Sequence, residues 1–264
     1  MPALTPDVLL ALGVTLAAGL ATVLGALSVL RADPADPRLL SLALAFAGGA
    51  MVYVSLVEIM PKGVAALSDS YGDRGGHALA TLSFFAGVAL LVLLDRLVPH
   101  PHAEPAAGGG PADRAAVARL GLLTAAAITA HNLPEGLATF FATLDNPSVG
   151  APLAVAIALH NIPEGVSIAV PVFYATGSRG KAVAAALLSG LAEPLGALIG
   201  WLVLGPFLSP ALFGIVFGVI AGAMVFLALD ELLPAARRNA RGHDTAYAMV
   251  AGMAVLAASL VLFR

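Results

Sequence analysis

Two apolar stretches of this chain carry the same polar phrase. The first is LLTAAAITAHNLPEGLATFFATL (122–144) and the second is PLAVAIALHNIPEGVSIAVPVF (152–173). Each is long enough to cross a bilayer as a helix, because a hydrocarbon core about 30 Å thick needs roughly 20 apolar helical residues. Each also contains His, Asn and Glu in the order H-N-x-P-E-G, and polar and ionisable groups at that depth are costly. The pair predicts a membrane fold built around a polar centre.

The composition of the whole chain supports a polytopic membrane protein. Apolar residues make up 59% of it, charged residues 11%, and its mean hydropathy is +0.95. An average soluble domain is about 45–50% apolar and about 25% charged. The chain has six histidines and no cysteine, which excludes disulfides and thiolate metal ligands. We expect the lipid bilayer to be a partner of this chain, and we expect no nucleic-acid partner.

The apolar windows predict an all-α fold with eight transmembrane helices in one domain over 1–264. The windows are 8–30, 39–61, 78–98, 119–143, 150–174, 180–204, 210–234 and 245–263. Only the segment at about 99–118, rich in Pro, Gly and Ala, reads as a flexible loop, and whether its His100 and His102 bind metal is left open. Most Lys and Arg residues fall on the side of this loop. The positive-inside rule therefore places the loop in the cytoplasm and both termini outside it, in the cell (inner) membrane.

A second sequence repeat relates the second and seventh predicted helices. GAMVYVSLVEIMP (49–61) resembles GAMVFLALDELLP (222–234), with Met51, Glu58 and Pro61 matching Met224, Glu231 and Pro234. The two helices run in opposite directions in the predicted topology. The match therefore predicts inverted repeats, helices 1–3 and 6–8, around a central helix 4/5 pair. Such repeats are common in secondary transporters. Chance similarity between apolar helices is the alternative.

The repeated phrase places its polar side chains on one region of each central helix. His131 with Glu135 and His160 with Glu164 are four residues apart and share a helix face. Asn132 and Asn161 flank that face. The proline of each phrase removes a backbone donor, and Gly136 and Gly165 permit close helix approach. An ionisable group at mid-bilayer costs about 2.5–3.5 kcal/mol, so duplicating the set for packing alone is disfavoured.

This mixture of imidazole, amide and carboxylate suits borderline divalent metals such as zinc and iron, and its oxygens also accept manganese. Glu193, in GLAEPLGALIG (190–200), is a further candidate ligand. Glu58 is expected toward the outer mouth of a path, and Asp230 and Glu231 toward the inner mouth. Met51 offers a thioether to the same path, with core packing as its alternative role.

The eight spans, the doubled H-N-x-P-E-G, the E-P-L-G of span 6 and the V-E-I-M-P of span 2 resemble the ZIP (Zrt/Irt-like) family of metal transporters, and most of all its bacterial ZupT branch. The resemblance implies uptake of Zn²⁺, often with Fe²⁺, Mn²⁺, Co²⁺ or Cd²⁺, into the cytoplasm, with no prosthetic group. It implies one metal position of His131, Glu135, His160 and Glu164, and an adjoining one of Asn132, Asn161 and Glu193 that shares Glu135 and Glu164. A methionine at position 51 also fits the family.

The function predicted from the sequence is a passive or secondary divalent-metal importer, since the chain has no P-loop to couple ATP. Its expected mechanism is rocking of helices 1–3 and 6–8 against the central pair. An intramembrane zinc-dependent hydrolase, in which Glu135 or Glu164 activates a metal-bound water, is the main alternative. A metal-stabilised scaffold leaves Glu58 and Glu231 unexplained. A homodimer is compatible with the sequence, which does not fix the oligomeric state.

Overall fold

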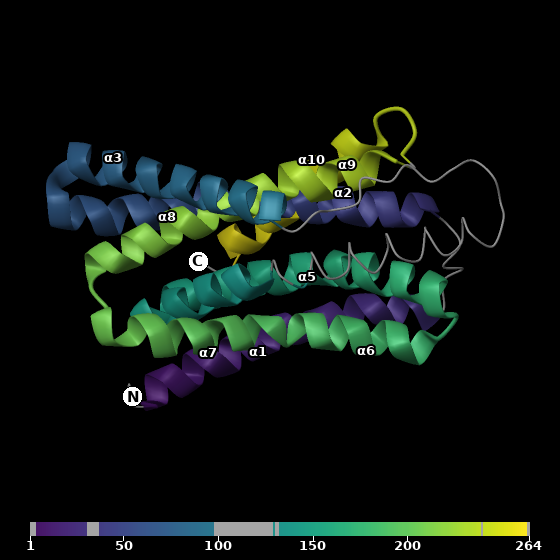
Figure 1. The fold of residues 1–264 in the computed structure, drawn as a ribbon, viewed down its shortest axis with the longest axis horizontal. Coiled ribbons are helices and arrows are strands. Elements are labelled where there is room, and N and C mark those ends of the chain that lie inside the picture. The colour runs from purple at the N-terminus through teal and green to yellow at the C-terminus, as the bar shows by residue number, and fades with distance from the viewer. Residues whose placement is uncertain (1–3, 31–36, 98–128, 130–131, 239, 263–264) are drawn as a thin grey trace.

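The computed structural model describes residues 4–30, 37–97, 129, 132–238 and 240–262, and within these ranges every regular element is a helix (Figure 1). The all-α prediction is confirmed. In chain order the elements are α1 (Pro6–Ala26), η1 (Leu27–Leu30), α2 (Pro37–Val54), η2 (Ser55–Ile59), α3 (Met60–Leu97), α5 (Pro147–Thr176), α6 (Arg179–Gly190), α7 (Ala192–Leu204), η3 (Gly205–Phe207), α8 (Pro210–Leu227), η4 (Ala228–Leu232), α9 (Leu233–Arg237) and α10 (Asp244–Leu262). Residues 132–145 form a further helical segment.

Three of the long helices begin with the same local signal. Thr5, Asn146 and Ser209 each precede a proline at the first helical position of α1, α5 and α8. In each case the side-chain oxygen accepts a hydrogen bond from a backbone N–H of the first turn. Such a residue satisfies a donor that the helix leaves unpaired, and the proline loses nothing at a position that has no partner. These helix starts therefore follow from local sequence.

Six runs within the described residues are long and apolar enough to cross a membrane, which agrees with a multi-pass membrane protein. One of them, Leu40–Leu93, covers most of two predicted spans, 39–61 and 78–98. α3 continues as helix past Pro61 and reverses at Gly72, whose φ of 72° is a conformation that glycine adopts without strain. Most of the predicted span 119–143 and the loop at 99–118, with His100 and His102, lie outside the described residues. The count of eight spans therefore stays a prediction.

The predicted span 180–204 consists of two helices, α6 and α7, joined at Leu191. Pro194 has no N–H to offer the carbonyl of Gly190, so the helical hydrogen-bond ladder is interrupted there. The break places Glu193 in the first turn of α7. Positive partial charge at a helix N-terminus favours a carboxylate in that position.

The helices form two bundles (Figure 1). The site bundle contains α1, α5, α6, α7 and the segment 132–145, and the second bundle contains α2, α3, α8 and α10. Glycines set the closest crossings of the site bundle. A Cβ at Gly19 would overlap the carbonyl of Gly190, and one at Gly165 would overlap that of Thr22. One at Gly136 would overlap the carbonyl of Glu193. The predicted close approaches at Gly136 and Gly165 are confirmed.

This grouping differs from the predicted division of helices 1–3 and 6–8 against a central pair. α1 packs mainly on α5 and also on α6, α2 packs mainly on α10 and also on α5, and α3 packs on α8. The reason is the placement of the small residues. The glycine faces of α1 and α6 meet each other and the central helices. The first and sixth predicted spans therefore belong with the site.

The second bundle contains two helix crossings that match contact by contact. Where α2 crosses α10, a Cβ at Gly49 would overlap Met249 and one at Gly252 would overlap Phe46. Where α8 crosses α3, the corresponding pairs are Gly222 with Phe84 and Gly87 with Val219. In all four helices the glycine follows the contacted residue by three positions. This correspondence is what the inverted repeat predicts for these helices, while the repeat as a whole stays a prediction.

The matched segments 49–61 and 222–234 also share a turn of π-helix. In η2 the backbone N–H of Met60 donates to the carbonyl of Ser55, and in η4 that of Leu233 donates to Ala228. Each π turn lies directly before its proline region, Pro61 in one segment and Pro234 in the other. Single π turns inside α-helices are often found at functional sites. Glu58 lies in η2, and Asp230 and Glu231 lie in η4.

Candidate metal site

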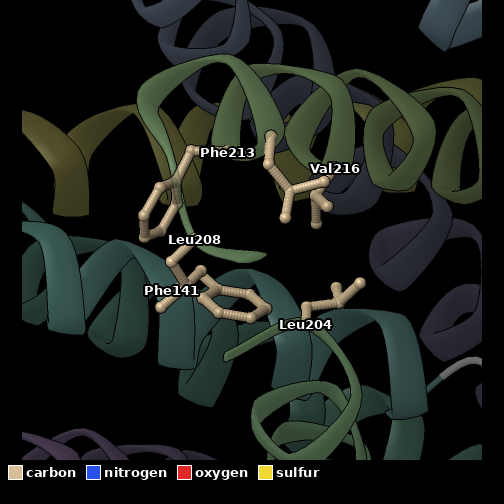
Figure 2. Close-up of a pocket in the computed structure, with 6 residues that line it drawn as sticks. Phe141, Leu204, Leu208, Phe213 and Val216 are labelled. Atoms are coloured by element: carbon tan, nitrogen blue, oxygen red, sulfur yellow. The ribbon is translucent and has the colours of Figure 1, made fainter. Parts of the chain in front are cut away.

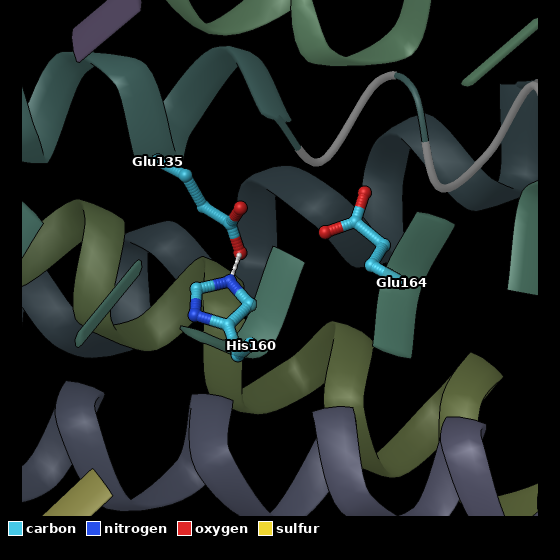
Figure 3. A group of neighbouring side chains, drawn as sticks. All are labelled: Glu135, His160 and Glu164. Atoms are coloured by element: carbon cyan, nitrogen blue, oxygen red, sulfur yellow. Dashed lines mark hydrogen bonds and ion pairs between the residues drawn. The ribbon is translucent and has the colours of Figure 1, made fainter. Parts of the chain in front are cut away.

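Glu135, His160 and Glu164 meet inside the site bundle (Figure 3). One ligand atom from each lies within 4.8 Å of the others, and all three side chains are buried. α5 presents His160 and Glu164 from one face, since they are four residues apart, and the segment 132–145 supplies Glu135. His160 Nε2 lies 3.2 Å from Glu135 Oε1. The structure thus brings together residues of both H-N-x-P-E-G phrases, as the sequence predicts.

The two asparagines are held by their amide nitrogens. Asn132 Nδ2 donates to the carbonyl of Ser189 at 3.0 Å and to its Oγ at 3.1 Å. Asn161 Nδ2 donates to the carbonyl of Ala18 at 2.9 Å and to Glu193 Oε1 at 2.5 Å. A backbone carbonyl oxygen can only accept a hydrogen bond, so the end of each amide that faces it is the NH2 group. The oxygen of each amide, on the side opposite to these contacts, is thereby left as an available acceptor.

Six buried acceptor atoms of this region have no hydrogen-bond partner among the described residues. They are Asn132 Oδ1, Glu135 Oε2, His160 Nδ1, Asn161 Oδ1, Glu164 Oε1 and Glu193 Oε2. A buried polar atom without a partner costs about 1–3 kcal/mol, and more when the group is charged. Among the described residues, no lysine or arginine forms an ion pair with the carboxylates of Glu135, Glu164 and Glu193. A concentration of unpartnered lone pairs with no fixed cation is the chemistry of a cation-binding site.

The donor set combines imidazole nitrogen with carboxylate and amide oxygens, which suits borderline divalent metals such as zinc and iron. His131, the other histidine of the predicted set, lies outside the described residues. Glu193 is buried in α7 and reaches the cluster through its hydrogen bond with Asn161. Described residues therefore include most of the ligands that the sequence predicts for two adjoining positions.

The weaker candidates lie on elements of the second bundle. Met51 is buried in α2. Glu58 is buried in η2, where its Oε1 accepts a hydrogen bond from the ammonium of Lys62. In η4, Asp230 is exposed and Glu231 is partly buried. The two matched acidic positions, Glu58 and Glu231, thus differ in burial.

Three groups in and around the site were not predicted from the sequence. Ser189 and the Ala18 carbonyl hold the two amides, and Lys62 pairs with Glu58. Ser189 and Lys62 each lie four residues from a predicted acidic residue, Glu193 or Glu58, so helical spacing was a signal for both. The Ala18 contact depends on how α1 crosses α5, for which the sequence carries no local signal.

A cavity of about 600 Å³ opens where α3 begins, the segment 132–145 ends and α8 begins. It is named the polar cavity because Lys62, Asp69 and Asp145 place charged groups in an otherwise mainly apolar lining. Its lining residues are Lys62, Ala65, Ala66, Asp69, Ala142, Asp145, Asn146, Leu208, Ser209, Pro210, Phe213 and Phe217. An apolar recess lies beside it under the α7–α8 connection (Figure 2). There the rings of Phe141 and Phe213 meet edge to face at 5.4 Å between centroids, which joins the two bundles.

Comparison with known proteins gives a consistent result. A family model described as ZIP Zinc transporter matches residues 7–119 and 100–259. The zinc transporter ZupT of Stenotrophomonas maltophilia is 59% identical over 263 residues, covering 98% of this chain and 97% of the relative. The protein of the same name in Xanthomonas axonopodis is 61% identical over 259 residues, covering 97% and 95%. That of Neisseria meningitidis serogroup B is 60% identical over 258 residues, covering 96% of each.

Proposed function

Because this chain belongs to the ZIP family and is a membrane transporter rather than an enzyme, we propose that it carries Zn²⁺ through the buried site around Glu135, His160 and Glu164. The single observation that supports this assignment most is the group of six buried acceptor atoms without partners. A divalent cation would give the carboxylate and amide oxygens among these atoms the partner that they lack. It also balances the negative charge of the buried carboxylates.

The proposed site has two adjoining metal positions. His131, Glu135, His160 and Glu164 form the first. Asn132, Asn161 and Glu193 form the second, with Glu135 and Glu164 shared. The hydrogen bonds to the amide nitrogens support the second position, because they leave both amide oxygens available as ligands. Since amide and carboxylate oxygens also accept harder ions, we propose Fe²⁺, Mn²⁺, Co²⁺ and Cd²⁺ as further substrates.

The proposed direction of transport is into the cytoplasm, with both termini outside. The positive-inside rule supports this orientation. Arg38, Arg179, Lys181, Arg237 and Arg238 lie at the starts of α2 and α6 and at the end of α9, on the side opposite the polar cavity. In this orientation the polar cavity is the outer entrance, and η4 with Asp230 and Glu231 lies toward the exit.

The proposed mechanism is alternating access by movement of the site bundle against the second bundle. Backbone-to-backbone glycine crossings within each bundle support this division, because they favour motion of each bundle as one body. The helices that carry the ligands then travel with the metal. Rings such as Phe141 and Phe213, which touch across the boundary, would slide or separate during the cycle.

An intramembrane hydrolase is not favoured. The family that includes this chain is one of transporters, and the full-length relatives are zinc transporters by name. Glu135 and Glu164 are therefore assigned to holding the cargo and not to activating a water molecule for hydrolysis.

The test is Zn²⁺ and Fe²⁺ flux into proteoliposomes, with wild type compared with Glu164→Ala. The control is Asp7→Asn, which neutralises an exposed carboxylate in the first turn of α1. We expect flux in the wild type and the control, and a loss of flux in Glu164→Ala. Equal flux in all three proteins, or none in the wild type, would rule out transport through this site.

A further inference from the structure

Lys62 lies between the polar cavity and a buried carboxylate. Its side chain lines the cavity, and its ammonium donates to Glu58 Oε1 one helical turn earlier in the chain. The Lys62 side chain is 20% exposed and that of Glu58 is 5% exposed. Lys62 therefore covers Glu58 on the side that faces the cavity.

Two helix faces lead from this cavity toward the metal site. On α3, Lys62, Ala65, Ala66 and Asp69 line the cavity with spacings of three and four residues, and the same face continues to Glu58. On the segment 132–145, Ala142 lines the cavity and lies seven residues, or two helical turns, from Glu135. A cation that enters from the cavity along the α3 face would meet Lys62 and then Glu58.

We propose that Lys62 is a specificity-determining residue, and that its ammonium is the resident cation of Glu58 which an incoming metal ion must displace. This inference rests on the proposed function, since it concerns the entrance to the same site. The Coulomb energy at a given distance from a carboxylate is proportional to the charge of the cation. At equal distance a divalent ion is therefore attracted twice as strongly as the ammonium, whereas K⁺ and Na⁺, with the same charge as the ammonium, are attracted no more strongly than it is.

Lysine is suited to this role because its compact charge sits on a flexible stem. The side chain can swing aside into the cavity when a divalent ion binds Glu58, and it can return when that ion has moved on. Asp69 and Asp145 line the same cavity and offer carboxylates to the displaced ammonium. The exchange leaves Glu58 compensated by a cation throughout.

The test measures the KM for Zn²⁺ uptake into proteoliposomes at constant ionic strength, with K⁺ replaced stepwise by choline. In the wild type we expect a KM that does not depend on K⁺. Lys62→Met removes the ammonium from this carboxylate. We expect the KM in choline to fall by about fivefold and to rise again as K⁺ is restored. Lys62→Arg keeps a cation at this position and should behave as the wild type does.

A double-mutant cycle with Glu58→Gln links the effect to this pair. Lys62→Met combined with Glu58→Gln has no charge left at either position, so its KM should not depend on K⁺. This neutral pair also provides a folded comparison if Lys62→Met alone is unstable. The inference would be overturned if the KM of Lys62→Met equals the wild-type value and does not change with the K⁺ concentration. An equal loss of maximal rate in Lys62→Met and Glu58→Gln at unchanged KM, which identifies a structural ion pair, would overturn it as well. Absence of wild-type flux would overturn the proposed function itself.

Discussion

The two bundles differ in whether their acidic side chains are paired with basic side chains. In the second bundle, Glu58 accepts from Lys62, and Arg38 meets Asp244 through two hydrogen bonds of 2.9 and 3.0 Å. In the site bundle, the carboxylates of Glu135, Glu164 and Glu193 are buried without lysine or arginine partners among the described residues. The acidic side chains of the second bundle are therefore paired with basic side chains of the same chain, whereas those of the site bundle depend on a transported cation.

The largest expected effect comes from removing a shared carboxylate of the site bundle. Glu135→Gln keeps the shape of the side chain and deletes the charge assigned to both metal positions. We expect Zn²⁺ affinity to fall by at least about 100-fold, or about 2.8 kcal/mol, measured by calorimetry on the purified protein. Glu231→Gln in the second bundle is the matched control. A similar loss in both variants would end the distinction between the bundles.

Zn²⁺ should also stabilise the folded protein through the site bundle. A ligand at 100 times its Kd adds about 2.7 kcal/mol to the free energy of unfolding. We therefore expect the melting temperature in detergent to rise with Zn²⁺ and to fall back when a chelator removes the metal. Glu58→Gln should keep this response and Glu135→Gln should lose it. A Zn²⁺ response that survives in Glu135→Gln would contradict the assigned site.

The matched crossings of the second bundle offer a test of packing. Gly222→Ala places a Cβ on the carbonyl of Phe84, and Gly49→Ala does the same at Met249. Because the obstructing atoms are backbone, we expect each change to lower stability by about 1–3 kcal/mol. The control is Gly13→Ala in α1, where nothing lies within 4 Å of the added Cβ. That substitution should be neutral or stabilising, since alanine is the better helix former. Unequal effects at positions 49 and 222 would weaken the equivalence of the two crossings.

The smallest expected effect concerns the orientation of an amide. Ser189→Ala removes one of the two acceptors of Asn132 Nδ2, and the backbone carbonyl remains as the other. Loss of about 1 kcal/mol of hydrogen bonding should raise the KM for Zn²⁺ by about fivefold with little change in maximal rate. Ser189→Thr should restore the KM, because it restores the hydroxyl. Ser259→Ala, at a buried serine of the second bundle whose hydroxyl donates to the Leu256 carbonyl, should leave it unchanged.

Much of this molecule could be predicted from local sequence. The apolar windows, the helix starts at Thr5, Asn146 and Ser209, and the break next to Pro194 all depend on residues close together in the chain. The meeting of Glu135, His160 and Glu164 was predictable as well, because one short phrase occurs twice at similar depth in neighbouring spans.

The grouping of the helices was not predictable in the same way. It depends on which glycine faces meet, such as Gly19 with Gly190, and those pairs are far apart in the chain. The same is true of the Ala18 carbonyl that orients Asn161. Lys62 was within reach of sequence reasoning, since it follows Glu58 by four residues and is the only other charged residue between positions 39 and 68.

The paired π turns bear on the history of the chain. A π turn holds one residue more than an α-helical turn. η2 and η4 carry that extra residue at the same position of their matched segments. If the two segments descend from one ancestral unit, a π turn shared by both is most simply older than the duplication. The ancestor then already had a widened turn at the acidic position, before its two copies came to hold Glu58 in one and Glu231 in the other.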